Sequence, residues 1–328
     1  MTIREIATLA GVSTAAVSRY FNDGYVGEEK RAAIRKVVED TGYLPSLQAQ
    51  TLRTKRTKTI GVIVPKIDSY SAGQVVAGIT SVLEERGYRL LLAVSDQNPE
   101  KELEYLAVLG EKQVDGVILL ATLLSARLKE KVRQMPVPVV LAGQHMKGCD
   151  CVYHDDYHAM HDVTELLLSK GCKSICYIGV TDRDQAVGAE RVRGFADALA
   201  KAGLPMPEGY VETGDFTIAS GYQSMEALHQ KNPDVDGVVC ATDEIAAGAM
   251  KYLRERGIII GRDVLLTGQG DSVLAANVSP SLTTIRFYYE KCGEESASMI
   301  LERIEQGRSS LRELKLGYEL VEQESTGK

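Results

Sequence analysis

Three closely spaced histidines are the residues whose types and spacing most resemble a metal site. His154, His158 and His161 could project from one face of a helix, an arrangement in which zinc is often bound. However, Asp155 or Asp156 is a natural N-cap, and a helix that begins there leaves His154 outside it. We therefore favour the alternative, two histidines on a surface turn, and expect no metal site.

No other group of side chains indicates catalysis. Cys172 and Cys176 lack a partner Cys-x-x-Cys pair, and all six cysteines are expected to be reduced and mostly to fill apolar space. Gly268-Gln-Gly270 lacks the third glycine of a dinucleotide fingerprint, and no phosphate-loop motif is present. Because no nucleophile can be paired with a base, we expect no catalytic residue, no cofactor and no enzymatic activity.

Charge is distributed unevenly along the chain. The 328 residues include 38 Lys and Arg against 45 Asp and Glu, and the net charge of −7 argues against a nucleic-acid partner. Residues 1–58, however, carry 10 basic against 6 acidic side chains, a net +4, which leaves −11 for the remainder. Residues 46–59 contain four basic side chains and no acid, so they form either a phosphate-binding segment or a solvated basic linker.

The first 45 residues have the pattern of three short helices. A helix over Ile3–Ala10 stops at the turn residue Gly11, and Ser13 caps a second helix over Thr14–Phe21. Such a pair is a helix-turn-helix, whose second helix enters the major groove of DNA, and a third helix is expected over 28–41. The alternative is a module that serves packing alone. The expected inward-facing residues of the first helix are Ile6, Leu9 and Ala10, and the expected DNA-facing residues of the second are Thr14, Ala15, Ser18 and Arg19.

A short segment after Pro45 has helical spacing but is too short to be stable alone. It contains the small residue Ala49 and the bulky Leu52, and basic residues, beginning with Arg53, follow it. This combination suits a helix that orders on DNA and inserts its leucine between minor-groove base steps. In the alternative, Leu52 packs against the next domain.

Beyond residue 58, short apolar strands alternate with amphipathic helices. This alternation predicts an α/β fold with parallel sheets that helices cover on both faces. Val-Asp-Gly-Val occurs at 114–117 and again at 235–238, each time entering a predicted strand, so we expect two similar subdomains with a ligand between them. No apolar run is long enough to cross a bilayer and no secretory segment is seen, so a cytoplasmic protein without a membrane partner is expected.

The sequence resembles the lactose/galactose repressor (LacI/GalR) family of bacterial transcription regulators over essentially its whole length. The resemblance rests on residues 2–22, on Tyr43-Leu-Pro45 and on residues 52–65. It implies an all-α headpiece at 1–45, a hinge helix and linker at 46–58, and a core at 59–328 like periplasmic sugar-binding proteins. The implied partners are a palindromic double-stranded operator, a second copy of the chain and a small sugar. The implied DNA-binding residues are Ser13, Thr14, Ala15, Ser18, Arg19, Asn22, Ala49, Leu52 and Arg53.

The same resemblance implies a set of effector-binding residues. Ala16 stands where the family usually has threonine, and Ser71 and Ala72 stand where it has paired phenylalanines. Finer similarity is to sucrose- or trehalose-type regulators, which implies a disaccharide. Gly143 and Gln144 occupy a site where a phosphate-binding arginine could stand, and only Lys66 is a basic candidate nearby, so a neutral sugar is favoured over a sugar phosphate. The alternative function is a cytosolic sugar-binding or sugar-processing protein whose N-terminal helices only dimerise. The implied effector-binding residues are Asp68, Ser69, Tyr70, Gln144, Arg191, Asp243, Gln269 and Phe287.

Overall fold

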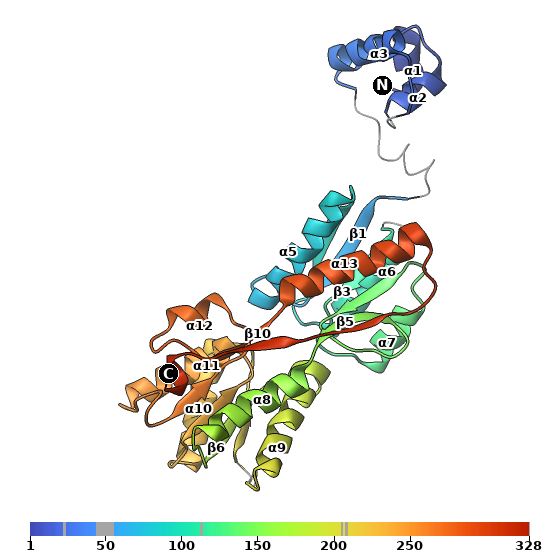
Figure 1. Ribbon diagram of the computed structural model, residues 1–328. Coiled ribbons are helices and arrows are strands. Elements are labelled where there is room, and N and C mark those ends of the chain that lie inside the picture. Colours follow the sequence, from blue (N-terminus) through green and yellow to red (C-terminus); the bar gives the residue numbers. More distant parts are fainter. Residues whose placement is uncertain (22–23, 44–55, 112–113, 205, 207–208, 328) are drawn as a thin grey trace. The chain divides into compact units, whose positions relative to one another are not determined.

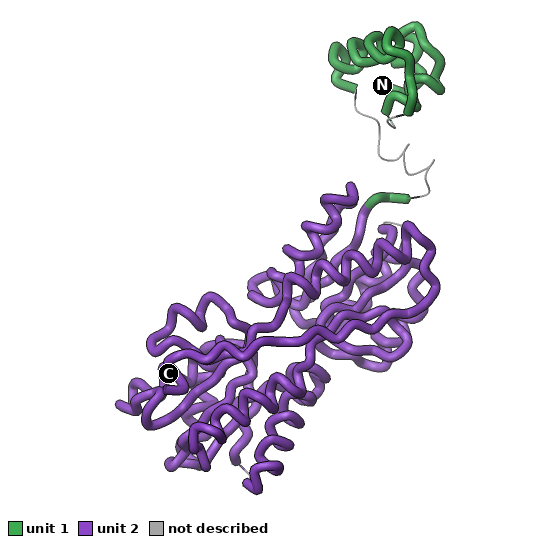
Figure 2. The backbone as a smooth tube through the Cα atoms, in the orientation of Figure 1, with its two compact units in different colours: residues 1–58 green, residues 59–328 purple. Residues whose placement is uncertain are grey.

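The computed structural model describes residues 1–21, 24–43, 56–111, 114–204, 206 and 209–327. The chain divides into two compact units, a first unit of residues 1–58 and a second unit of residues 59–328 (Figure 2). The first unit is all-α, and the second is a mixed α/β structure built on parallel sheets (Figure 1).

The first unit contains three helices in its described part, as predicted. Thr2 begins α1 with a capping box: its hydroxyl accepts from the Glu5 amide, and the Glu5 carboxylate accepts from the Thr2 amide. Gly11 adopts φ +64°, a left-handed conformation that forms the turn before α2. The helices are α1 (Ile3–Leu9), α2 (Thr14–Tyr20) and α3 (Glu28–Thr41).

The core of the first unit differs from the prediction at one position. Ile6, Val17 and Ile34 are fully buried, but Leu9 is 59% exposed. Helix α1 is only two turns long and offers one narrow buried face, which Ile6 and Ala7 occupy. The prediction that Leu9 faces inward is therefore wrong.

The second unit begins with a lobe built on six parallel strands in the order β11-β5-β4-β3-β1-β2. Apolar residues on one face of this sheet pack against α5 and α13, and those on the other face pack against α6 and α7. The strands are β1 (Thr59–Val64), β2 (Arg89–Val94), β3 (Gly116–Leu119), β4 (Val139–Ala142), β5 (Asp150–His154) and β11 (Glu313–Leu316), and the helices are α5 (Tyr70–Glu85), α6 (Pro99–Gly110), α7 (Ala126–Arg133) and α13 (Tyr289–Gln306).

A second lobe is built on four parallel strands in the order β7-β6-β8-β9. Helix α8 packs against α9, and α10 packs against α11. A π-helix over Gln185–Glu190 leads directly into α9. The strands are β6 (Ile175–Gly179), β7 (Val211–Thr213), β8 (Gly237–Cys240) and β9 (Leu265–Thr267), and the helices are α8 (Asp156–Ser169), α9 (Arg191–Lys201), α10 (Ile218–Lys231), α11 (Asp243–Glu255) and α12 (Val273–Asn277).

The chain passes between the two lobes three times. The first passage joins β5 to α8, the second joins β10 (Thr284–Phe287) to α13, and the third joins β11 to β12 (Tyr318–Val321) (Figure 1). Strands β10 and β12 pair in antiparallel fashion. The repeated Val-Asp-Gly-Val leads into β3 of one lobe and β8 of the other, so the prediction of two similar subdomains is confirmed.

Among the residues that the structure describes, no helix is both long and apolar enough to cross a membrane.

Candidate functional site

Helix α2 presents the predicted DNA-reading residues of the first unit. Ser13 is the N-cap, and its hydroxyl accepts from the Ala16 amide at 3.2 Å. Thr14 and Ala15 are exposed on the first turn, and Ser18 is half-buried on the second. Ala16 is buried in the headpiece core, which explains why a small residue fits there and why it cannot reach a base.

Arg19 is exposed near the end of α2, where its Nε donates to the Ala15 carbonyl at 3.3 Å. A guanidinium has five donor hydrogens, so this bond leaves donors for a phosphate or a guanine. The remaining predicted DNA contacts, Asn22, Ala49, Leu52 and Arg53, lie outside the described residues.

A cleft between the lobes of the second unit holds most of the predicted effector residues. Loops that follow the carboxyl ends of strands from both sheets line a cavity of about 370 Å³, which is within the usual range for a small-molecule site. Tyr70 begins α5, and the Ser69 hydroxyl caps it by accepting from the Ala72 amide at 3.4 Å. The predicted residues on the cavity wall are Asp68, Ser69, Tyr70, Gln144, Arg191 and Gln269.

Arg191 is the best-anchored side chain of this wall. It is only 4% exposed, and its Nε donates to the Asp156 carboxylate at 2.7 Å, while another donor reaches the Ala241 carbonyl. The ring of Phe287 lies 4.8 Å from the guanidinium carbon. Burial alone would lower the pKa of Arg191, but the Asp156 carboxylate raises it overall, so the cation persists in the cleft.

Gln144 and Asp184 connect the two lobes across the cleft. The Gln144 amide donates to the Asp184 carboxylate at 2.8 Å and to the Thr122 carbonyl at 3.3 Å. Asp184 is also the N-cap of the π-helix, where it accepts from the Val187 amide at 3.0 Å. Burial raises the pKa of Asp184, and these two hydrogen bonds oppose that shift.

Gln144, His154 and Gln269 of the wall each leave a polar atom without a protein partner. The Oε1 atoms of Gln144 and Gln269 and the Nε2 atom of His154 are buried and make no hydrogen bond within the described structure. Burial lowers the pKa of His154, so its ring is neutral and Nε2 can accept or donate one hydrogen bond. Unpaired buried polar atoms are costly, and their convergence on one cavity indicates a polar ligand.

Two predicted effector residues lie behind the wall rather than on it. Asp243 is fully buried, and its carboxylate accepts from the Thr284 hydroxyl at 2.6 Å and from the Ser272 amide at 2.7 Å. Phe287 is buried between Arg191 and the ring of His154. The structure therefore places Asp243 and Phe287 as supports of the cavity, and the neighbouring Glu244 lines it instead.

Several polar residues of the wall were not among the predicted effector-binding residues, including His154, Asp156, Asp184 and Glu244. A signal for the first two was present, because His154 ends β5 and Asp156 follows it by two residues, and ligands bind at the carboxyl ends of strands in open α/β sheets. Asp184 and Glu244 each lie at or near the start of a helix that follows a strand. Nothing in the local pattern distinguished them from ordinary helix-capping residues.

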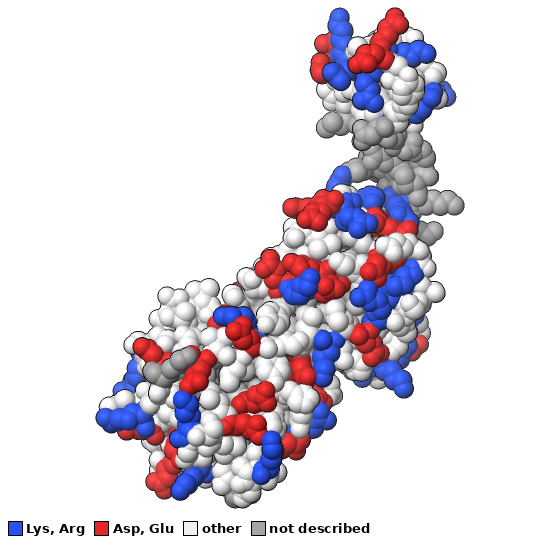
Figure 3. All heavy atoms as spheres, in the orientation of Figure 1, with Lys and Arg blue, Asp and Glu red and all other residues white. Residues whose placement is uncertain are grey.

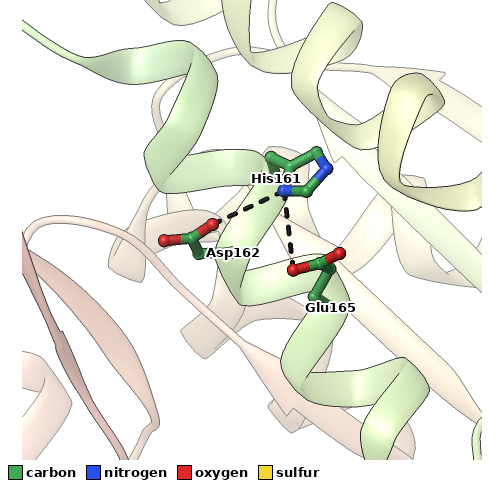
Figure 4. Close-up of side chains that lie close together, drawn as sticks. All are labelled: His161, Asp162 and Glu165. Carbon is green, nitrogen blue, oxygen red and sulfur yellow. Dashed lines mark hydrogen bonds and ion pairs between the residues drawn. The ribbon is translucent and has the colours of Figure 1, made fainter. Parts of the chain in front are cut away.

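The three histidines do not converge. His154 lies at the end of β5 and faces the cleft, whereas His158 and His161 lie on the surface of α8. His161 instead approaches Asp162 at 3.4 Å and Glu165 at 3.8 Å (Figure 4). Because Tyr318 and Lys201 already bond the other oxygens of these two carboxylates, the group forms a surface network and is assigned no metal.

The cysteines behave as predicted, as apolar core residues. All six are free and buried. Burial raises the pKa of Cys172 and of Cys176 to about 12, so neither thiol ionises near neutral pH.

Comparison with known proteins identifies both units. Residues 57–324 match the family of periplasmic binding proteins and sugar binding domain of LacI family, and residues 2–46 match the bacterial regulatory proteins of the lacI family. The chain is 32% identical to the HTH-type transcriptional regulator RegA of Clostridium saccharobutylicum over 99% of this chain and 98% of that protein. It is 31% identical to the sucrose operon repressor of Staphylococcus xylosus over 92% of this chain and 93% of that protein. The solved complex of the transcriptional regulator CelR with cellobiose aligns over 99% of both chains, with a TM-score of 0.77 and 29% identity.

These matches cover both helix α2, the predicted DNA-reading helix, and the cleft. The match over residues 2–46 argues against the alternative in which the N-terminal helices only dimerise. The chain therefore belongs to the LacI family of bacterial regulatory proteins and is a DNA-binding transcriptional regulator.

Proposed function

We propose that this protein represses a carbohydrate-utilisation operon and that a small neutral sugar, most suitably a disaccharide, controls its affinity for DNA. Two copies would bind one palindromic operator, since a two-fold DNA site calls for a two-fold protein. In this proposal the protein is not an enzyme and needs no cofactor. The observation that carries it is the set of unpaired polar atoms of Gln144, His154 and Gln269 in the cleft.

The chemistry of the cavity favours a sugar over other polar ligands. Sugar hydroxyls both donate and accept, so they satisfy carbonyl oxygens, a neutral imidazole and carboxylates in one site. Arg191 adds a planar donor whose direction Asp156 holds in place. A volume of about 370 Å³ leaves room for a ligand larger than a single small polar group.

The charge of the wall favours a neutral sugar over a phosphorylated one. Two basic residues, Lys66 and Arg191, line the cavity, and Arg191 is already paired with Asp156. Asp68, Asp184 and Glu244 bring further negative charge to the same wall. A phosphate would be repelled by these carboxylates, whereas hydroxyls can donate to them.

The printed names of two relatives support a disaccharide. One is a sucrose operon repressor and the other is a regulator in complex with cellobiose. Both sugars are neutral disaccharides with many hydroxyls. We therefore extend this ligand class to the present chain, without choosing among sucrose, trehalose and cellobiose.

Control of DNA binding would follow from closure of the two lobes around the sugar. The ligand stabilises whichever lobe arrangement it binds more tightly, and that arrangement alters the geometry of the hinge segments at 46–58. Coupling is reciprocal, so DNA must change sugar affinity by the factor by which sugar changes DNA affinity.

Fluorescence anisotropy with labelled DNA from the protein's own locus tests the proposal. Binding should weaken steeply with salt, with a log-log slope of about −0.9 per phosphate neutralised. Addition of sucrose, trehalose or cellobiose should shift the affinity, and a thermal-shift screen of sugars and their phosphates should single out the ligand. Salt-independent or undetectable DNA binding would contradict the regulator, and stabilisation only by sugar phosphates would contradict the neutral ligand.

A further inference from the structure

A second cavity lies beside the effector cavity and has the opposite charge. It has a volume of about 550 Å³, and six Lys and Arg side chains but only three Asp and Glu side chains line it. The basic residues are Lys129, Arg133, Lys147, Arg183, Arg193 and Lys315. A positive wall is unexpected here, because residues 59–328 as a whole carry a net charge of −11.

All three carboxylates of this wall are already neutralised. Asp155 pairs with Lys315 at 2.7 Å, Glu190 pairs with Arg193 at 2.5 Å, and Asp156 pairs with Arg191 of the effector cavity at 2.6 Å. Each of these three carboxylates therefore already has a basic side chain as its ion-pair partner.

Three cations of the second cavity remain without a carboxylate. Among the described residues, Lys129, Lys147 and Arg183 form no ion pair, and Arg133 makes only a long contact of 3.8 Å with Glu130. Elsewhere on the second unit, basic and acidic side chains are intermixed over the visible face (Figure 3). Unpaired cations that share a concave wall raise the local potential and attract anions.

The three unpaired cations come from both lobes. Lys129 lies on α7 and Lys147 follows β4, both in the first lobe, whereas Arg183 precedes the π-helix of the second lobe. Gln144, His154 and Asp156 line both cavities and therefore lie between them. An anion held by Lys129, Lys147 and Arg183 would bridge the lobes on the other side of these three residues.

We propose that the second cavity is a separate binding site for a small phosphate-bearing ligand, either an inorganic phosphate species or a phosphate ester. The ligand would neutralise Lys129, Lys147 and Arg183 and thereby favour the lobe arrangement in which they are close. The regulator would then respond to two ligands, a neutral one in the first cavity and an anionic one in the second. Because both act on the same lobe equilibrium, each changes the affinity for the other.

Isothermal titration of the full-length chain at constant ionic strength tests this site. The probes are inorganic pyrophosphate and glucose 1-phosphate, which represent the two sources of phosphate, with glucose as the neutral comparison. We expect at least one phosphate probe to bind and glucose not to bind in this cavity. The double variant Lys129→Gln/Arg183→Gln should weaken that binding by about tenfold or more, because charge-assisted hydrogen bonds are lost.

Lys131→Gln is the matched control, because Lys131 lies on the same helix as Lys129 but does not line the cavity. It should leave the affinity for the phosphate probe unchanged, and unfolding temperatures should show that all variants fold. This control also separates the cavity from the basic first unit, which can attract phosphate by itself.

Three results would overturn the second site. One is a Kd weaker than about 1 mM for both phosphate probes, and another is an equal loss of affinity in Lys131→Gln and in the double variant. The third is loss of phosphate binding in a saturating concentration of disaccharide, which would place the phosphate probe in the effector cavity. The titration needs no sugar or DNA, so its failure leaves the proposed sugar-controlled repressor intact.

Discussion

Helix α2 of the first unit and the effector cleft of the second unit place their polar side chains in opposite environments. On α2, the polar side chains of Thr14 and Arg19 are exposed, and water satisfies them until DNA arrives. In the cleft, Gln144 and Gln269 are 3% and 2% exposed, and each keeps an acceptor that no described residue satisfies.

This difference follows from the ligands that the two regions meet. DNA is long and charged, so a few exposed donors on a convex helix suffice, and phosphate attraction supplies much of the affinity. A small neutral sugar offers little charge, so binding needs a site where each unpaired hydrogen-bonding atom is costly until the ligand arrives. Exposed polar side chains thus mark the DNA site, whereas buried polar atoms without a hydrogen-bond partner mark the ligand site.

Removal of residues 1–58 should produce the largest effect and separate the two regions completely. Operator affinity should fall by at least about a thousandfold, the usual gap between specific and nonspecific binding, because the reading helix is lost. Sugar binding should persist, since the whole cleft lies within residues 59–328. Anisotropy measures the operator affinity and calorimetry measures the sugar affinity. Loss of both despite a folded core would refute the assignment of DNA binding to the first unit and sugar binding to the second.

Arg191→Lys tests the cleft while it retains the charge. Lysine cannot reproduce the planar fork that bonds Asp156, so the sugar contacts become misdirected. We expect the disaccharide affinity to fall by about 30-fold, as for other disrupted buried charge pairs. Operator affinity measured without sugar should be unchanged, and a comparable loss there would mean that Arg191 acts through the lobe equilibrium.

Arg19→Gln tests the reading helix in the converse experiment. Loss of one phosphate or guanine contact should weaken operator binding by about tenfold and make the log-log salt slope shallower by about one. Sugar affinity should not change. Lys173→Gln, a substitution in the second unit, should leave the slope as in the wild type. An unchanged slope in Arg19→Gln would indicate a base contact without phosphate neutralisation.

Gln269→Ala should produce a smaller effect confined to the cleft. The variant removes one neutral hydrogen bond to the sugar, so calorimetry should show a loss of about fivefold. Gln223→Ala, at an exposed position of α10 that lines none of the described cavities, is its control. Equal affinities for wild type and Gln269→Ala would remove Gln269 from the set of sugar contacts.

Asp184→Asn should change the pH dependence of stability in the protein without sugar. Burial raises the pKa of Asp184, so its stabilising contribution is fully present below the ordinary aspartate pKa and is lost as pH rises through the folded-state pKa. The variant should therefore unfold with a flatter pH profile in urea titrations without sugar. Asp263→Asn is the control. Arg262 lowers the pKa of Asp263, so the variant should change the pH dependence of stability in the opposite direction. A profile identical to that of the wild type would contradict the shift at Asp184.

Local patterns in the sequence determined a large part of this protein. Caps, turn glycines and apolar spacing are properties of neighbouring residues, so α2 and α3 agree with their predicted ranges to within one residue. Alternating strands and helices specified the α/β core for the same reason, and the resemblance located Gln144, Arg191 and Gln269 on the cavity wall.

Only the tertiary structure decided which polar residues serve the ligand and which serve the fold. Asp243 and Glu244 are adjacent acidic residues at the start of one helix, but the first is fully bonded within the core and the second lines the cavity. His154 changes from a possible metal ligand to a cleft residue because β5 ends beside the second lobe. The two neighbouring cavities of opposite charge likewise depend on side chains from distant elements that only the folded chain brings together. Sequence spacing records neighbours along the chain, whereas burial and pairing depend on neighbours in space.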